Sequence, residues 1–245
     1  MCFIIALLVV FIEFVPRTVH MFIQKSREIF NGKSYVVNLC AVQNSKNVVV
    51  FLPGVSGGAF DARFDFLLNT ASETNFSFLR CDFWKSGADL DEKSISELLL
   101  VLRDVISLLL SKGFTKIVFI GKSFGGLLAL LLNDSRVSGM ILISPTAFVA
   151  DTATAPAVSS KKLGSIHSIF DVTVDKSLVW GIRSPVLVVH GNADAIVPVE
   201  NSQKLVSFLR RGELFIVEGA DHSFKTVDHQ AIVVLRTKEF LSKFN

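Results

Sequence analysis

Short apolar runs alternate along most of this chain with longer segments whose apolar residues recur every three or four positions. Asn47–Leu52 (NVVVFL) and Lys116–Ile120 (KIVFI) are runs typical of strands buried on both faces of a sheet. Ser94–Lys112 has apolar residues at helical spacing, and Ser94 with Glu97 forms a capping-box pattern at its start. The alternation predicts an α/β protein with a mostly parallel central sheet flanked by helices.

The same patterns assign the remaining elements. Phe22–Phe30 and Ser34–Val42 are expected to be strands, joined by the hairpin signal Asn31-Gly32. The other elements expected, in chain order, are helix Ala62–Thr70, strand Phe76–Cys81, helix Phe124–Asn133, strands Gly139–Ile143 and Pro185–His190, helix Asn201–Arg210, strand Glu213–Val217 and helix His229–Phe244. Residues 146–183 have no strong period, so we expect a small cap insertion of short helices and loops over the carboxyl edge of the sheet.

Composition narrows the class of protein. The chain has 245 residues, half of them hydrophobic, and a mean hydropathy of +0.51, which favours a substantial core over disorder. Its charges are interspersed and sum to +3, so no basic stripe predicts binding to nucleic acid. The cysteines Cys2, Cys40 and Cys81 are scattered, without a C-x-x-C pair. We therefore expect reduced thiols, a cytoplasmic protein and no metal site.

The first residues need separate treatment. Met1–Val15 is apolar except for Glu13. As a helix it would span about 22 Å, short of the ~30 Å core of a bilayer. Three interpretations remain: a short anchor that would make the protein membrane-associated, a strand or helix packed on the domain, or a true start at Met21. The sequence is therefore divided into an apolar leader, residues 1–20, whose role these three interpretations leave open, and a domain, residues 21–245.

One string carries the clearest chemical signal. Residues 116–132 read KIVFIGKSFGGLLALLL, so that a G-x-S-x-G motif centred on Ser123 stands between an expected strand and an expected buried helix. That context is the one such a turn requires, because a cramped strand-to-helix turn lifts the serine hydroxyl above the sheet. The first turn of the helix then directs the Phe124 N–H toward a developing oxyanion. Ser123 is therefore the candidate nucleophile.

Two candidate partners follow Ser123 along the chain. Asp194 lies in PVLVVHGNADAIVP and His222 lies in LFIVEGADHSF, each in a loop just past an expected strand. Ligands collect at the carboxyl ends of strands in open α/β sheets, so these loops are suited to a site. Among the rivals, His190 is expected to shape its loop, and Asp221 is a poor orienting partner because adjacent side chains diverge.

The three motifs together resemble the α/β-hydrolase superfamily. G-K-S-F-G-G, H-G-N-A-D-x-x-V-P and G-A-D-H-S-F carry the resemblance, which runs from about residue 21 to the end of the chain. Within the superfamily the sequence is similar to the monoacylglycerol-lipase-like and dienelactone-hydrolase-like groups. The resemblance implies Ser123 as nucleophile, His222 as base and Asp194 as the acid that orients it, with no cofactor.

The second oxyanion donor is expected in the turn Leu52–Gly58 (LPGVSGG). Relatives often carry His-Gly where this chain has Pro53-Gly54, which is a departure from the pattern. Since the donor is a backbone N–H, the change need not remove it. Placement by resemblance assigns the Val55 N–H, with Ser56 as the second choice. Asp82, in a degraded form of another loop of the superfamily, is expected to hold a turn.

The substrate is the least constrained part of the prediction. Phe148 and Trp180 in the insertion, together with Phe60 and Phe64 after the oxyanion turn, are candidates to line an apolar acyl site. The sequence thus predicts an esterase or lipase-like enzyme acting on a small-molecule carboxylic ester. Thioesterase, amidase and acyltransferase activities use the same residues and stay open. The alternative from another class is a non-catalytic interaction protein with the same fold.

Overall fold

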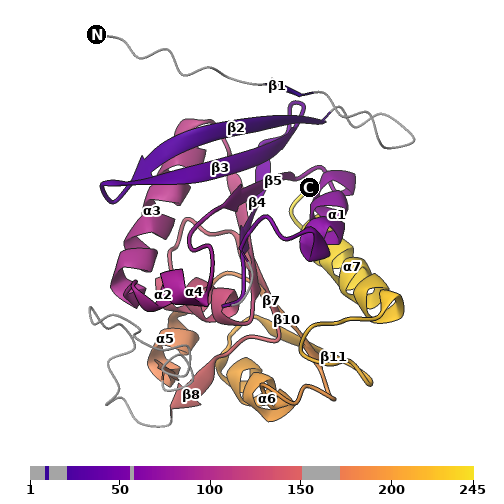
Figure 1. Ribbon diagram of the computed structural model, residues 1–245. Coiled ribbons are helices and arrows are strands. Elements are labelled where there is room, and N and C mark those ends of the chain that lie inside the picture. Colours follow the sequence, from indigo (N-terminus) through magenta and orange to yellow (C-terminus); the bar gives the residue numbers. More distant parts are fainter. Residues whose placement is uncertain (1–8, 11–20, 56–57, 151–171) are drawn as a thin grey trace.

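The computed structural model describes residues 9–10, 21–55, 58–150 and 172–245 (Figure 1). Within these residues, strands line up in one sheet in the order β1-β2-β3-β5-β4-β6-β7-β10-β11. They are β1 (Val9–Val10), β2 (Met21–Phe30), β3 (Lys33–Val42), β4 (Asn47–Leu52), β5 (Ser77–Cys81), β6 (Lys116–Lys122), β7 (Gly139–Ile143), β10 (Val186–Gly191) and β11 (Gly212–Val217). From β5 to β11 in this order every pairing is parallel, whereas β1, β2 and β3 pair antiparallel.

Helices cover both faces of the sheet, so the predicted fold class is confirmed. They are α1 (Asp65–Glu73), α2 (Gly87–Asp91), α3 (Ile95–Ser111), α4 (Phe124–Leu132), α5 (Lys176–Gly181), α6 (Val199–Phe208) and α7 (Val227–Ser242). Buried residues of α1 and α7 pack with one face of the sheet, and those of α3, α4 and α6 pack with the other (Figure 1). The core is therefore divided into two layers.

Local sequence signals explain how the elements begin and turn. Asn31 and Gly32 have φ values of 45° and 71°, as a tight hairpin turn between β2 and β3 requires. Ser94 and Glu97 form the predicted capping box at the start of α3. Every residue of α4 is buried. Because burial of each large apolar side chain contributes about 1.5–3 kcal/mol, α4 is held firmly behind the strand that precedes it.

The interval 146–183 departs in part from the prediction. Phe148–Ala150 (β8) and Thr173–Asp175 (β9) form a two-stranded parallel sheet, where only short helices and loops were expected. Strands of three residues are too short to leave a period in the sequence. The short helix α5 fits the expectation, and residues 151–171 lie outside the described part of the chain.

Two residues of the apolar leader are described. Val9 and Val10 pair antiparallel with Ile23 and Gln24 at the edge of the sheet. At these two positions the leader therefore lies against the domain, while residues 1–8 and 11–20 fall outside the description. None of the helices in the described ranges combines the length and the apolar character that a membrane span requires.

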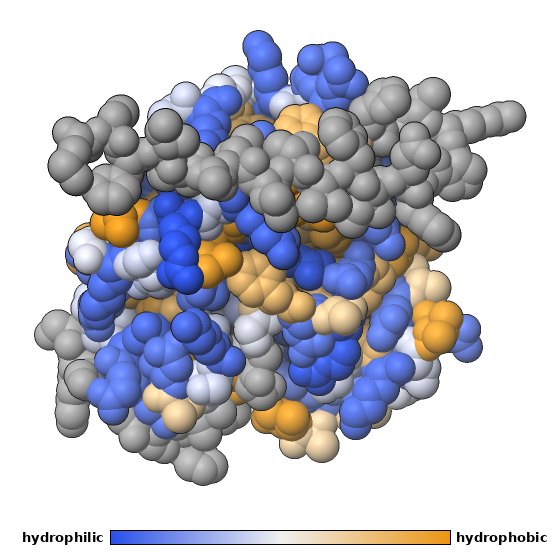
Figure 2. Space-filling view, turned by 45° about the horizontal axis from the view of Figure 1, so that its top comes forward, coloured by the Kyte–Doolittle hydropathy of each residue, from blue (hydrophilic) through white to orange (hydrophobic). Residues whose placement is uncertain are grey.

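The surface is mixed in character. Figure 2 shows hydrophilic side chains spread over the face in view, with hydrophobic ones in small separate groups. The ion pairs of the described residues include local ones, as between Arg136 and Asp134, and long-range ones, as between Lys243 and Glu213. This pattern agrees with the interspersed charges of the sequence.

Candidate active site

Ser123 stands at the turn between β6 and α4 in a strained conformation. Its φ of 52° and ψ of −116° lie where residues with a side chain are rare, at a cost of about 1–3 kcal/mol. Four backbone hydrogen bonds hold it there: its N–H donates to Ile143 O at 2.9 Å, and its carbonyl accepts from Gly126 at 2.9 Å and from Leu127 and Thr146 at 3.3 Å each. The neighbouring strand β7 thus fixes the turn.

Glycine flanks Ser123 because backbone approaches it closely. A Cβ on Gly121 would lie 2.6 Å from Gly126 Cα, and one on Gly125 would lie 2.1 Å from Leu52 O. Side-chain carbons essentially never approach backbone this closely. The start of α4 therefore packs directly against the end of β4, which carries the turn expected to supply an oxyanion donor.

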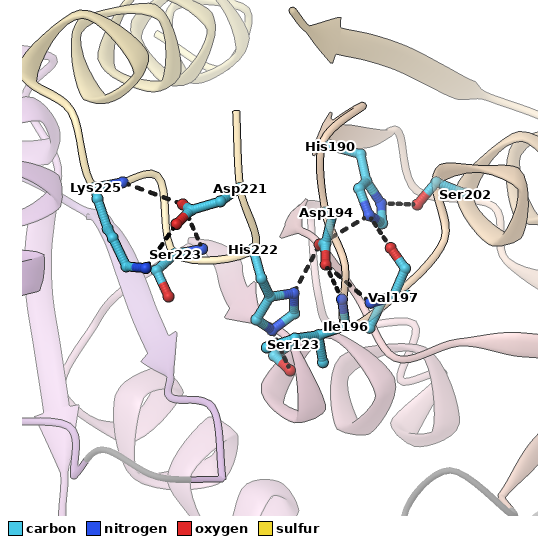
Figure 3. Close-up of polar contacts among 10 residues, drawn as sticks. All are labelled: Ser123, His190, Asp194, Ile196, Val197, Ser202, Asp221, His222, Ser223 and Lys225. Atoms are coloured by element: carbon cyan, nitrogen blue, oxygen red, sulfur yellow. Dashed lines mark hydrogen bonds and ion pairs between the residues drawn. The ribbon is translucent and has the colours of Figure 1, made fainter. Parts of the chain in front are cut away.

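The structure brings Ser123, His222 and Asp194 together (Figure 3). His222 Nε2 lies 3.1 Å from Ser123 Oγ, and His222 Nδ1 lies 2.7 Å from Asp194 Oδ2. A carboxylate only accepts hydrogen bonds, so Nδ1 carries the proton and Nε2 is left to accept from the serine hydroxyl. The Asp194 side chain is completely buried, and that of His222 is 14% exposed.

Four donors surround the Asp194 carboxylate. Oδ1 accepts from the backbone N–H groups of Ile196 and Val197, each at 2.9 Å, and Oδ2 accepts from His222 and from His190 Nε2 at 3.1 Å. Burial alone would raise the pKa of Asp194, but the hydrogen bonds from His190, His222 and Val197 outweigh it and hold that pKa well below its usual value. Asp194 is therefore a stable anion inside the protein.

His190 is a buried connection between Asp194 and helix α6. Its Nε2 lies 3.0 Å from Val197 O as well as close to Asp194, so Nε2 carries a proton. Its Nδ1 forms a hydrogen bond of 2.6 Å with Ser202 Oγ. The sequence suggested a loop-shaping role for His190, and this contact with the carboxylate was not predicted from it.

The carboxylate next to His222 along the chain serves its own loop. Asp221 Oδ1 accepts from the Ser223 N–H at 3.1 Å, and Asp221 Oδ2 pairs with Lys225 Nζ at 2.9 Å (Figure 3). Asp82 bonds to strand β3 rather than within a turn as expected, because its Oδ1 accepts from the Val36 N–H. Neither group shares a described hydrogen bond with His222.

The turn after β4 lies beside the nucleophile. A Cβ on Gly54 would stand 3.4 Å from Ser123 Cβ, so the turn and the serine are in contact. In the described part of the chain no hydrogen bond uses the N–H of Val55 or of Phe124. Among the described residues, these two backbone donors thus have no acceptor. Ser56, the second candidate, falls outside the described residues.

Lys122, the residue before Ser123, is an unusual feature of the turn. Its side chain is buried, and among the described residues its Nζ has no hydrogen-bond partner. Burial lowers the pKa of Lys122 to about 7, although the nearby Asp194 and Asp221 carboxylates act to raise it. A buried lysine therefore lies next to Ser123 in the chain, and no described hydrogen bond stabilises its charge.

Two of the four aromatic residues expected at the acyl site have ring partners in the structure. Phe64 packs its ring 4.9 Å from that of Phe51 in the core layer under α1 and α7. Trp180 is 54% exposed, and the Arg210 guanidinium stacks 4.6 Å from its ring centre. Phe60 is exposed in the turn after β4, and Phe148 is half-buried in β8. Phe64 and Trp180 thus have packing partners of their own.

Two cavities described in the structure lie away from Ser123. One of about 340 Å³ lies beside the start of β11, and one of about 200 Å³ lies beside the β2–β3 hairpin. Neither is lined by Ser123, His222 or the four aromatic residues. The described residues include no group of three His, Cys, Asp or Glu side chains placed to hold a metal ion.

The chain is similar to known proteins in part of its sequence and in its fold. Residues 168–243 match a family model described as TAP-like protein. No curated protein matches the chain in sequence. Est1E from Butyrivibrio proteoclasticus is similar in structure, with a TM-score of 0.73 and 20% identity over 89% of this chain and 98% of that one.

Two further solved structures are similar over nearly the whole chain. Dienelactone hydrolase from Anabaena variabilis has a TM-score of 0.69 and 16% identity, covering 89% of this chain and 96% of its own. Paleococcus ferrophilus monoacylglycerol lipase has a TM-score of 0.66 and 17% identity, covering 91% and 99%. At such low identities the similarity shows a shared fold.

Proposed function

The chain has the α/β-hydrolase fold, as the resemblance in its sequence implied, and on this premise we propose that it is a serine hydrolase that cleaves a carboxylic ester. One observation carries the proposal. Ser123 Oγ, His222 Nε2, His222 Nδ1 and Asp194 Oδ2 form a continuous line of hydrogen bonds of 3.1 and 2.7 Å. This arrangement suits a base that removes the serine proton while a fixed anion holds the ring.

The proposed reaction has two halves. Ser123 Oγ attacks the acyl carbon while His222 Nε2 takes its proton, and the ester oxygen leaves as an alcohol that receives this proton. A water then gives a proton to His222 and attacks the acyl-enzyme, and Ser123 is restored when it takes the proton back. Asp194 stays ionised throughout, as its low pKa favours, and stabilises the imidazolium.

The Phe124 and Val55 N–H groups are the proposed oxyanion donors. Phe124 opens α4, so its N–H has no partner within the helix and adds to the positive end of the helix dipole. Val55 follows Gly54, which contacts Ser123. A pair of backbone donors in a buried site stabilises developing charge strongly because it needs little reorganisation.

We propose that the ester substrate carries an apolar acyl group. Phe60 and Phe148 are the candidates to contact it, since the structure leaves both rings partly exposed. Residues 146–183 are the proposed cap. A structure of Est1E holds ferulic acid, and a small ester of such an acid is a suitable first trial substrate for this chain.

A series of p-nitrophenyl esters, from acetate to laurate, tests the proposal. We expect the wild-type protein to hydrolyse them and Ser123→Ala to be inactive, with the preferred chain length reporting on the acyl site. A fluorophosphonate probe should label the wild type and leave Ser123→Ala unlabelled. A folded wild-type protein that neither turns over nor reacts would instead favour the non-catalytic interaction protein.

A further inference from the structure

One buried side chain contacts both segments that are proposed to supply oxyanion donors. The indole Nε1–H of Trp84 donates to Gly54 O at 3.1 Å. The same ring meets that of Phe124 edge-on, with centres 5.5 Å apart and planes at 64°. Trp84 is only 1% exposed, and it lies in the loop after β5 that departs from the superfamily pattern.

The hydrogen bond to Gly54 O acts on the Val55 N–H through the peptide plane. The Gly54 carbonyl and the Val55 N–H belong to one peptide unit, and described peptide bonds are trans. In a trans peptide these two groups point in opposite directions. When Trp84 holds the carbonyl on the core side, the N–H must point to the other side, and among the described residues it has no acceptor there.

This peptide unit needs such a restraint. Glycine at position 54 has a wide choice of backbone angles, so rotation of the following peptide costs little by itself. The far end of the turn passes near the backbone of the same residue, since a Cβ on Gly58 would lie 3.8 Å from Trp84 O. Trp84 thus restrains the Gly54 end of the turn with its side chain.

We propose that Trp84 is the positioning residue of the oxyanion hole: it orients the Val55 N–H through Gly54 O and supports the Phe124 end through the contact between the two rings. The inference rests on the proposed function. It identifies a determinant of transition-state stabilisation that does not itself contact the substrate. It also accounts for a buried indole N–H that is satisfied by a loop carbonyl rather than by the core.

Trp84→Phe tests the proposal because it keeps an aromatic ring and removes the N–H. Loss of a whole oxyanion donor costs about 10²–10³ in kcat, so a loosened donor should cost about 10- to 100-fold. We expect KM to stay within about twofold. The affinity for a trifluoromethyl ketone, which forms an oxyanion on Ser123, should fall by the same factor as kcat/KM.

Phe83→Leu is the matched control. Phe83 is the buried neighbour whose ring lies 6.2 Å from that of Trp84, and it makes no hydrogen bond to the turn. The Phe83→Leu variant should have a melting temperature lowered about as much as that of Trp84→Phe, while its kcat should change less than about twofold. Equal losses of kcat in the two variants, or unchanged kcat and ketone affinity in Trp84→Phe, would overturn the inference.

A second variant and the wild-type activity separate failure of the inference from failure of the proposed function. If Trp84→Phe does not fold, 3-benzothienylalanine at position 84 keeps the bicyclic shape and replaces the N–H by sulfur, and the same losses are expected. A wild-type protein that lacks Ser123-dependent hydrolysis and labelling would defeat the proposed function, and the role of Trp84 with it. Activity that depends on Ser123 but not on the Trp84 N–H defeats the inference alone.

Discussion

His190 Nε2 lies 3.1 Å from Asp194 Oδ2, the same oxygen that accepts the Nδ1 proton of His222 at 2.7 Å. Two imidazoles therefore share one carboxylate oxygen, and only one of them faces Ser123. The second ring is completely buried and tied to Ser202 on α6. It holds the carboxylate in place while the proposed reaction changes the charge of His222.

Replacing His190 by phenylalanine should weaken both stability and turnover. The ring volume stays similar, but Ser202, Val197 O and Asp194 each lose a partner, which should cost about 1–3 kcal/mol of unfolding free energy. Turnover should fall about tenfold, since a shift of ~1.4 kcal/mol in the barrier is a factor of ten. Urea unfolding and ester kinetics measure the two effects. His229→Phe on α7 is the control, and a folded His190→Phe with full turnover would contradict the role.

Asp194→Asn should lower turnover by up to ~10⁴-fold with little loss of structure. An amide nitrogen facing His222 would favour the tautomer whose Nε2 carries the proton and cannot accept from Ser123. Steady-state kinetics on a short ester, with circular dichroism as a check of folding, measures this. Asp221→Asn, one residue before His222, should keep its activity. Similar losses in both variants would mean that Asp194 is not the orienting acid.

Lys122→Met should stabilise the protein in a pH-dependent way. The pKa of Lys122 falls from its usual value of 10.5 to about 7 on burial, so between these pH values the unfolded chain binds more protons than the folded one. The free energy of unfolding of the wild type therefore rises as the pH increases from 7 to 10.5. We expect Lys122→Met to be more stable by about 2–4 kcal/mol at pH 7 and by much less near pH 10.5.

Urea titrations at pH 7 and pH 10 check this difference. Lys116→Met is the matched control, because Lys116 is an exposed residue at the start of the same strand. It should change stability equally at both pH values. A Lys122→Met variant with the same stability increment at both pH values would show that Lys122 is charged in the folded state.

Gly125→Ala should prevent stable folding. The new methyl group would lie 2.1 Å from Leu52 O, and neither the strand nor the buried helix can move aside. We expect a loss of at least about 3 kcal/mol, beyond the usual cost of overpacking. Gly181→Ala is the control, since its methyl group would meet only Asn133 Nδ2 at 3.6 Å. Thermal unfolding compares the melting temperatures of the two variants. A Gly125→Ala variant with the melting temperature of the wild type would contradict the close packing of α4 against the end of β4.

Local patterns in the sequence were enough to predict the order of the main elements. The apolar run of β4, the capping box of α3 and the Asn31-Gly32 turn depend on neighbours within a few positions, so they can be read directly. The short elements α2, β8 and β9 could not, because three to five residues carry no period.

The chemical groups were visible in the sequence, whereas their geometry was decided by tertiary structure. Ser123 and His222 are 99 residues apart, and only the parallel order of β6, β7, β10 and β11 brings their loops together. The contacts of Trp84 with Gly54 and of His190 with Asp194 and Ser202 likewise arise from packing between elements. A sequence lists donors and acceptors, but the fold determines which of them meet, because each buried polar group must take a partner from whatever the packed chain places beside it.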